Sequence, residues 1–242
     1  MQLKDQSIVI IGGSSGIGLA TAKLAKEYGA NVTIAARTPE KLQKAAEVLG
    51  NVRTIVADIS HEAQVKQIFQ ELDQVNHLFV AAGSLSTGRT ETDGKIASTP
   101  LEELKHPITE RVFGAIYAIR HALPKMSEGS ITLMSGLFST RPIPGVSVIA
   151  AAVAGIEAMA RTLALELSPI RVNTVSPGYI DTPLLQAAFG DQYEQVIQAQ
   201  AATLPTKKIG TAEETARAIL FLMTNGFMNG EVLHIDGGGR FI

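Results

Sequence analysis

A glycine-rich turn near the start of the chain is the first feature whose residue types and spacing could do chemistry. It follows an apolar run and reads Ile11-Gly12-Gly13-Ser14-Ser15-Gly16-Ile17-Gly18. Glycine lets the backbone turn sharply, and the helix that begins after such a turn presents backbone N–H groups to a phosphate. Outside a strand–helix–strand unit the turn would indicate only a tight connection. Inside one it indicates a dinucleotide site formed by Gly12, Ser14, Ser15, Gly16, Ile17 and Gly18.

A cation follows the second β-branched run. Asn31–Ala36 is followed by Arg37 and not by an acidic residue. An acidic side chain there would bind the ribose 2′-hydroxyl of NAD(H), whereas a cation suits the 2′-phosphate of NADP(H). Ser14 or Ser15 could donate a hydroxyl to the same phosphate. The pattern therefore favours NADP(H), and the alternative is that Arg37 is a solvated surface cation.

The elements that must position these residues are short β-branched runs that alternate with helical patterns. Most runs are continuously apolar, which is typical of strands buried on both faces of a parallel sheet. The alternation predicts one doubly wound, Rossmann-type α/β domain over residues 1–242, with a seven-stranded, mostly parallel sheet and helices on both faces. The predicted strands are Ser7–Gly12, Asn31–Ala36, Val52–Ala57, His77–Ala81, Ser130–Met134, Ile170–Ser176 and Val232–Ile235.

Capping patterns predict where several helices begin. A threonine precedes a proline twice, and a Thr-x-x-Glu capping box precedes a later apolar run. Long helices are predicted at Thr99–Met126 and Ser147–Ser168. The starting signals are Thr38-Pro39, Ser60 ahead of His61–Leu72, Thr182-Pro183, and Thr211 with Glu214.

Two segments are predicted to be mobile loops on the substrate side, at residues 84–107 and 179–210. The first is polar and rich in glycine and proline, and the second follows a predicted strand. Both would lie at the carboxyl ends of strands, where an open α/β sheet binds ligands. The alternative is that they are ordinary surface loops.

Composition excludes several classes of protein. Of 242 residues, 45% are hydrophobic, and 21 Lys and Arg stand against 23 Asp and Glu, giving a net charge of −2. This balance excludes a disordered chain and gives no general attraction to nucleic acid or to an anionic membrane. With no cysteine there are no disulfides or thiolate metal sites, and the five histidines lack metal-ligand spacing. No secretory signal or membrane span is expected, and Val146–Ala160 is interpreted as a buried helix. We expect a cytoplasmic protein.

Over nearly its whole length the sequence resembles the short-chain dehydrogenase/reductase family. The motifs that carry the resemblance are Gly12-x-x-x-Gly16-x-Gly18, Ala57-Asp58-Ile59, Val80-Ala81-Ala82-Gly83, Arg171 to Gly178, and Ile235-Asp236-Gly237-Gly238. Val80-Ala81 stands where the family has two asparagines. The resemblance implies hydride transfer with a nicotinamide cofactor. It also implies cofactor contacts from Asp58, Ile59, Ala82, Gly83, Pro177, Gly178, Ile180 and Thr182.

The segment that resembles the family's catalytic region departs from its pattern. The family uses an Asn, a Ser and a Tyr-x-x-x-Lys pair, in which the lysine lowers the tyrosine pKa and the tyrosine serves as acid or base. Placed without gaps between matching segments, this sequence has Arg111, Gly136, Ile149 and Val153 at those positions. None of its four tyrosines is followed by lysine at the fourth residue. Isoleucine and valine cannot donate a proton.

Two residues remain as catalytic candidates. Arg111 could donate to a developing oxyanion, and the alternative is an interhelical or interface salt bridge. Ser135 could orient a substrate oxygen, unless its side chain points away. Hydride transfer would then need an acceptor that requires little acid assistance, such as an electron-poor carbonyl or a quinone. The other reading is a catalytically silent NADP(H) sensor or scaffold; a lyase would need an acid–base pair that the sequence does not offer.

The resemblance also implies a homo-oligomer, either a dimer or a tetramer. Members of the family commonly pair their long helices across a two-fold axis, and the corresponding helices here are Thr99–Met126 and Ser147–Ser168. A face of small residues, Ala150, Ala154 and Ala158, would allow a close helix approach. The same face could equally pack on the sheet.

Overall fold

A parallel sheet forms the centre of the molecule. The computed structural model describes residues 3–81, 83 and 94–242. Its main strands are β1 (Ser7–Ile11), β2 (Asn31–Ala36), β3 (Arg53–Val56), β4 (His77–Val80), β5 (Ser130–Met134), β6 (Arg171–Pro177) and β9 (Val232–Ile235). They form one seven-stranded sheet in the order β3-β2-β1-β4-β5-β6-β9, and every neighbouring pair is parallel. The predicted doubly wound fold is confirmed, and the sheet is wholly rather than mostly parallel.

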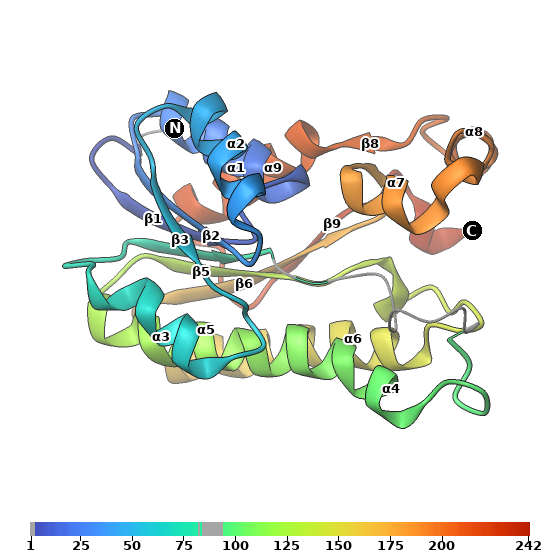
Figure 1. Ribbon diagram of the computed structural model, residues 1–242, viewed down its shortest axis with the longest axis horizontal. Helices are drawn as coiled ribbons and strands as arrows, with labels where there is room; N and C mark the ends of the chain where they lie inside the picture. The colour runs from blue at the N-terminus through green and yellow to red at the C-terminus, as the bar shows by residue number, and fades with distance from the viewer. Residues whose placement is uncertain (1–2, 82, 84–93) are drawn as a thin grey trace.

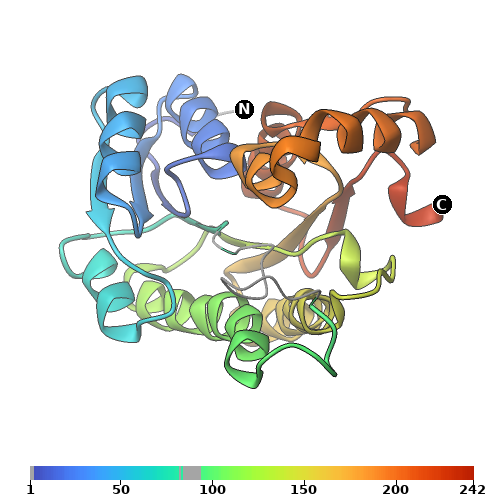
Figure 2. The same ribbon diagram turned by 45° about the vertical axis from the view of Figure 1, so that its right-hand side comes forward.

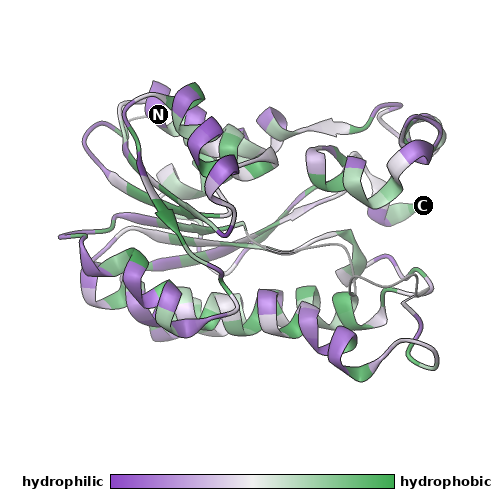
Figure 3. Ribbon diagram, viewed as in Figure 1, coloured by the Kyte–Doolittle hydropathy of each residue, from purple (hydrophilic) through white to green (hydrophobic). Residues whose placement is uncertain are grey.

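Helices cover both faces of this sheet, as Figures 1 and 2 show. One layer holds α1 (Gly16–Glu27), α2 (Pro39–Leu49) and α9 (Ala212–Thr224), and the other holds α3 (Glu62–Gln70), α4 (Leu101–Ile108), α5 (Gly114–Ala122) and α6 (Ser147–Glu166). Successive residues of β1 alternate between the layers, since Ile8 and Ile10 pack with one core cluster and Val9 and Ile11 with the other. In Figure 3 hydrophilic residues concentrate on α2, α3 and α4, outside the largely hydrophobic strands. Burial on both faces explains why inner strands such as β1 and β4 read as continuous apolar runs.

Two of the predicted helix starts are confirmed by their hydrogen bonds. At α9 the Thr211 hydroxyl accepts from the Glu214 N–H at 3.1 Å, and Glu214 accepts from the Thr211 N–H at 2.9 Å. At α7 (Pro183–Phe189) the Thr182 hydroxyl accepts from the Leu185 N–H at 3.5 Å. These three bonds satisfy N–H groups at the helix starts that have no backbone partner within their helix.

The predicted cap at Ser60 is wrong. Helix α3 begins at Glu62 with His61 as its N-cap, and that side chain makes no capping bond. The Ser60 N–H instead donates to the Asp58 carboxylate at 2.9 Å. Ser60 therefore belongs to a turn ahead of the helix, which starts one residue later than predicted. Thr38 does precede α2, with Pro39 in the first turn, but its side chain makes no capping bond.

The long helix predicted at Thr99–Met126 is interrupted. The chain forms α4, a π-helical turn at Thr109–Phe113, α5, and a 3₁₀ turn at Leu123–Lys125. Pro107 lies inside α4, two residues before the π-helical turn begins, and proline removes a helical N–H and crowds the preceding turn. Such a wide turn re-aims the side chains that it carries. Here it carries Glu110 and Arg111.

The segment 179–210, predicted as a mobile substrate-side loop, contains regular structure. It forms β7 (Ile180–Asp181), α7, a 3₁₀ turn at Gly190–Gln192 and α8 (Tyr193–Thr203), and β7 pairs with β8 (Gly210–Thr211). Its glutamine- and alanine-rich composition favours helix once Thr182-Pro183 has started one. Of the other predicted loop, residues 84–93 lie outside the described residues, and α4 begins at residue 101.

Helix α6 is buried on one side only. Among the described residues it is the one helix whose length and hydropathy would allow a membrane span, with a mean hydropathy of 1.7 over a window that is 39% buried. Core helices pass the same test. Its sheet-facing residues Ile149, Val153 and Ile156 are buried, whereas Ala154 and Ala158 are exposed. The small-residue face therefore does not pack on the sheet, and the helix predicted to be buried is buried on its sheet-facing side.

His77 at the start of β4 gives the fold a pH dependence. Its ring nitrogens lie 2.8 Å from the Ser130 hydroxyl and 2.7 Å from Oε1 of Gln6. Burial, with a smaller contribution from Arg171, lowers the pKa of His77 from 6.5 to about 4. Between these two values the unfolded chain binds the proton and the folded chain does not. Stability is therefore retained above the unfolded pKa and lost as the pH falls, by about 3 kcal/mol over the full span.

We expect this loss to be visible in urea unfolding between about pH 7.5 and about pH 4.5. A His77→Gln variant lacks the titrating ring, so its unfolding free energy should fall by roughly 2–3 kcal/mol less than that of the unaltered chain over the same range. Parallel pH profiles for the two proteins would show that His77 does not cause the dependence.

Candidate functional site

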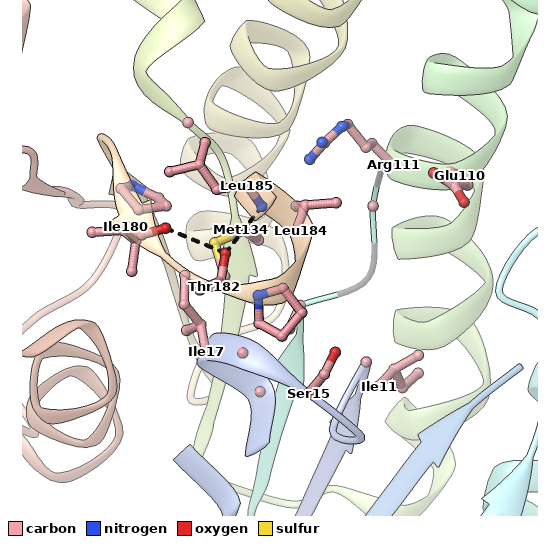
Figure 4. Close-up of a pocket in the computed structure, with 18 of the residues that line it drawn as sticks. Ile11, Ser15, Ile17, Glu110, Arg111, Met134, Ile180, Thr182, Leu184 and Leu185 are labelled. Carbon is pink, nitrogen blue, oxygen red and sulfur yellow. Dashed lines mark hydrogen bonds between the residues drawn. The ribbon is translucent and has the colours of Figure 1, made fainter. Parts of the chain in front are cut away.

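One pocket at the carboxyl end of the sheet gathers the residues singled out in the sequence. It encloses about 500 Å³, and Figure 4 shows it between the glycine-rich turn, the π-helical turn that carries Arg111, and α7. Its lining comes from the carboxyl ends of β1, β2, β4, β5 and β6 together with α6 and α7. This is the edge at which open α/β sheets bind ligands.

The glycine-rich turn is shaped by close backbone contacts. Gly12 and Gly16 have φ of 92° and 52°, a region that favours glycine. A Cβ on Gly18 would lie 2.2 Å from the Gly12 carbonyl oxygen, so α1 packs directly against the strand end. No acidic residue lies in the first turn of α1, and its N-cap Ser15 makes no side-chain capping bond. The backbone N–H groups at the start of α1 and the dipole of this helix therefore suit an anion such as a pyrophosphate.

The pocket continues past β2 and β3 to a charged end. Arg37, Asp58 and Ile59 line it there, together with Lys41, which the sequence analysis missed. Lys41 lies on the first turn of α2, one helical turn after Arg37, and that spacing was the signal available. Two cations beside the glycine-rich turn suit a phosphate on the adenosine ribose. Arg37 thus lines the pocket, although its side chain is 59% exposed to solvent.

The structure brings together every described residue that was predicted to contact the cofactor. Residue 82, the position of Ala82, lies outside the described residues. The residues that line the pocket are Gly12, Ser14, Ser15, Gly16, Ile17, Gly18, Arg37, Asp58, Ile59, Gly83, Pro177, Gly178, Ile180 and Thr182. Their convergence fits a dinucleotide that runs from the charged end to the apolar end. Which of them touch the cofactor stays a prediction.

Arg111 is a buried guanidinium at the apolar end of the pocket. It is 7% exposed, and a Cβ on Gly83 would lie 2.7 Å from its Nη1, so the guanidinium rests against the chain just after β4. Burial lowers the pKa of Arg111, and the nearby charge of Glu110 opposes this shift. The group remains cationic at neutral pH because guanidinium starts from a very high pKa. Figure 4 shows Arg111 and Glu110 pointing to different sides of their helix.

Apolar side chains surround this end of the pocket. Ile149 and Val153 of α6 line it together with Gly136. Two aromatic side chains, Phe138 and Tyr179, also line the pocket. The remaining apolar lining comes from Met134, Leu137, Leu184, Leu185 and Ala187. A ligand here meets a largely hydrophobic wall and the charged guanidinium of Arg111.

Ser135 lines the pocket, but its hydroxyl is held by α6. The residue is 3% exposed, and its hydroxyl donates to Oε1 of Glu157 at 2.6 Å and lies 3.3 Å from the Val153 carbonyl oxygen. Glu157 stands one helical turn beyond Val153 and was not singled out in the sequence. Its bond gives the Ser135 hydroxyl a structural partner, so a role in orienting substrate stays a prediction.

Thr182 fixes α7 over the glycine-rich turn. Its hydroxyl donates to the Ile180 carbonyl at 3.3 Å while accepting from the Leu185 N–H. A Cβ on Gly16 would lie 3.3 Å from the Thr182 methyl group. Within residues 3–81, 83 and 94–242, no group of three His, Asp or Glu side chains could hold a metal ion.

This fold and this pocket define a dinucleotide-binding α/β protein, and comparisons with known proteins agree. The family model described as "Enoyl-(Acyl carrier protein) reductase" matches residues 12–239. The short-chain dehydrogenase/reductase malC of Malbranchea aurantiaca is 34% identical over 256 residues, which cover 98% of this chain and 95% of that protein. The 3-oxoacyl-[acyl-carrier-protein] reductase of Bos taurus is 30% identical over 244 residues, covering 97% and 98% of the two chains.

Solved structures show the same likeness. One described as MalC reductase/Diels-Alderase has a TM-score of 0.91 at 28% identity and covers 99% of this chain and 98% of its own. A small-chain dehydrogenase in complex with NADPH has a TM-score of 0.85 at 32% identity, covering 99% and 100%. The chain therefore belongs to the short-chain dehydrogenase/reductase family, a family of oxidoreductases.

Proposed function

We propose that this chain is an NADP(H)-dependent oxidoreductase that reduces an activated carbonyl or a quinone by hydride transfer, without a tyrosine–lysine acid. The observation that carries the proposal is the apolar end of the pocket. There Ile149, Val153 and Arg111 line the pocket, and the ungapped placement of the sequence puts the first two at the positions of the family's tyrosine and lysine.

The charged end supports NADP(H) as the cofactor. The N–H groups at the start of α1 would hold the pyrophosphate, and Arg37 and Lys41 would face the 2′-phosphate. Asp58 would accept a hydrogen bond from the adenine amine, and Thr182 would contact the carboxamide of the nicotinamide. When bound, NADPH supplies a hydride. Relatives named as reductases and a similar structure in complex with NADPH support this assignment.

The missing proton donors define the class of substrate. Neither Ile149 nor Val153 can protonate an oxygen as it gains negative charge. The buried guanidinium of Arg111 can instead donate hydrogen bonds to that oxygen and stabilise its charge where water is largely excluded. Acceptors whose reduced form is already a stabilised anion need little assistance beyond these hydrogen bonds. Electron-poor carbonyls and quinones meet that condition, and simple ketones do not.

The test compares acceptors with one preparation of the protein. NADPH oxidation, followed by its absorbance, should be faster with electron-poor quinones and activated diketones than with unactivated ketones. With a given acceptor, NADPH should be oxidised faster than NADH. Calorimetry on the same preparation measures nucleotide binding separately. Tight NADPH binding without turnover on any acceptor would favour the second reading, a sensor or scaffold. Absence of binding would contradict both.

We also propose that the chain forms a homo-oligomer through the outer face of α6. Ala154 and Ala158 are exposed there, and the exposed fractions of Leu165 on α6 and Phe113 beside α5 are 82% and 46%. Small residues on a helix let a second helix approach closely, and large exposed apolar side chains favour burial against a partner. A second copy of this chain presents the same surface to itself across a two-fold axis.

An Ala154→Arg variant should convert the oligomer into monomers. The long charged side chain would meet its own copy across the axis and hold the two helices apart. Light scattering coupled to size exclusion measures the mass directly. Arg161→Lys on the same helix keeps its charge and serves as the control. An unchanged oligomer in Ala154→Arg would place the interface elsewhere.

A further inference from the structure

Glu110 is a carboxylate in the pocket that no cofactor-binding motif accounts for. Its side chain is 5% exposed, and it occupies the π-helical turn one residue before Arg111. Its Oε1 lies 3.2 Å from Nη1 of Arg37, which is 73 residues away in the chain. The cation assigned to the 2′-phosphate therefore already donates to a buried negative charge.

The two partners differ in their freedom to move. Glu110 is held by its burial and by the helix that carries it, and its second oxygen lies 3.7 Å from Nδ1 of His106. Arg37 lies at the end of β2 with a side chain 59% exposed, so its guanidinium can turn towards Lys41 and the glycine-rich turn. A phosphate placed there must draw Arg37 away from Glu110 or share it with that carboxylate.

Either outcome lowers the affinity for a phosphate on the ribose. Drawing Arg37 away breaks an ion pair, and sharing it leaves a dianion near a carboxylate that water screens poorly. Charges at such range near a protein surface interact strongly enough to change an affinity by roughly tenfold. A ribose that ends in a neutral 2′-hydroxyl meets neither penalty. The Glu110 carboxylate thus lowers the affinity for NADPH, which carries the 2′-phosphate, and leaves the affinity for NADH nearly unchanged.

We infer that Glu110 is a specificity-determining residue, which competes for Arg37 and thereby reduces the preference of this chain for NADPH over NADH. The inference rests on the proposed NADP(H) function. It goes further because it assigns opposite effects to two charged residues of the same pocket. Arg37 raises the affinity for the phosphorylated cofactor, and Glu110 limits that gain.

Titration calorimetry on four proteins tests the competition: the unaltered chain, Glu110→Gln, Arg37→Ala and the double variant. Glu110→Gln should bind NADPH about tenfold more tightly while its Kd for NADH changes less than about twofold. In the Arg37→Ala background the same substitution should tighten NADPH binding by less than about twofold, because the shared partner is gone. Adenosine 2′,5′-bisphosphate, which lacks the nicotinamide, should show the same pattern and so exclude an effect through Arg111.

The matched control is Glu102→Gln, which removes the same charge from α4 at a side chain that is 83% exposed and pairs with Lys105. It should leave both Kd values unchanged, and thermal unfolding confirms that every variant is folded. Unchanged or weaker NADPH binding by Glu110→Gln would overturn the inference, as would equal tightening in both backgrounds. If the unaltered chain binds NADH and NADPH but this pattern is missing, only the inference fails. If no variant binds either nucleotide, the proposed function fails with it.

Discussion

Replacing Arg111 by alanine is expected to lower kcat for an activated acceptor by roughly 10²–10³-fold, the loss seen when a single oxyanion donor is removed. The guanidinium is a buried charge in a pocket that is also lined by Ile149 and Val153. Without it the developing negative charge would face hydrocarbon. Binding of NADPH should be retained, with a Kd within about threefold, since the phosphate-binding residues lie at the other end of the pocket.

The measurement separates binding from chemistry. Calorimetry gives the Kd for NADPH, and single-turnover oxidation of NADPH gives the rate of the hydride step. Arg111→Met, which keeps most of the side-chain volume, guards against an effect of the cavity that alanine leaves. Arg141→Ala is the matched control, because Arg141 follows β5 but is not among the described residues that line the pocket. Unchanged turnover in Arg111→Ala would remove this residue from the mechanism.

Replacing Gly18 by alanine is expected to abolish nucleotide binding, with at least a 100-fold rise in Kd, which corresponds to about 2.7 kcal/mol. The added Cβ would lie 2.2 Å from the Gly12 carbonyl oxygen, 2.9 Å from its carbonyl carbon and 3.1 Å from the Cα of Gly13. All three atoms belong to the backbone, so the clash can be relieved only by opening the turn. We expect a stability loss of roughly 1–3 kcal/mol as well, as for other overpacked sites.

Calorimetry with NADPH and urea unfolding measure the two effects of Gly18→Ala. Gly226→Ala provides the control, because a Cβ there would have no heavy atom within 4 Å. That variant should bind NADPH normally and change stability by less than about 0.5 kcal/mol. Normal NADPH affinity in Gly18→Ala would show that the glycine-rich turn does not hold the pyrophosphate.

Local patterns were sufficient to predict the sheet and the cofactor end of the pocket. The inner strands β1 and β4 read as short apolar runs because both of their faces are buried, and Thr211 with Glu214 caps α9 through residues three apart. The glycine-rich turn is local in the same sense, since Gly12 and Gly18 meet within one connection. Interactions of this kind form between residues close together in the chain, so the sequence predicts them.

Other predictions failed at the boundaries of helices. Ser60 does not cap α3, because the helix begins at Glu62 with His61 as its N-cap. The helix expected at Thr99–Met126 breaks around the π-helical turn that follows Pro107. No periodicity in the sequence marks the width of that turn, although it determines where Glu110 and Arg111 point.

By itself the sequence determined the doubly wound sheet, the phosphate-binding turn and the apolar residues opposite Arg111, since these follow from residue type and short-range spacing. Only the tertiary structure decided which charges meet. Arg37 reaches Glu110 across 73 residues, and Ser135 donates to Glu157 across 22. Such pairs form because packing of helices on the sheet brings their elements together, and a hydrogen bond extends only about 3 Å. The placement of whole elements, rather than any local preference, therefore sets the electrostatics of this pocket.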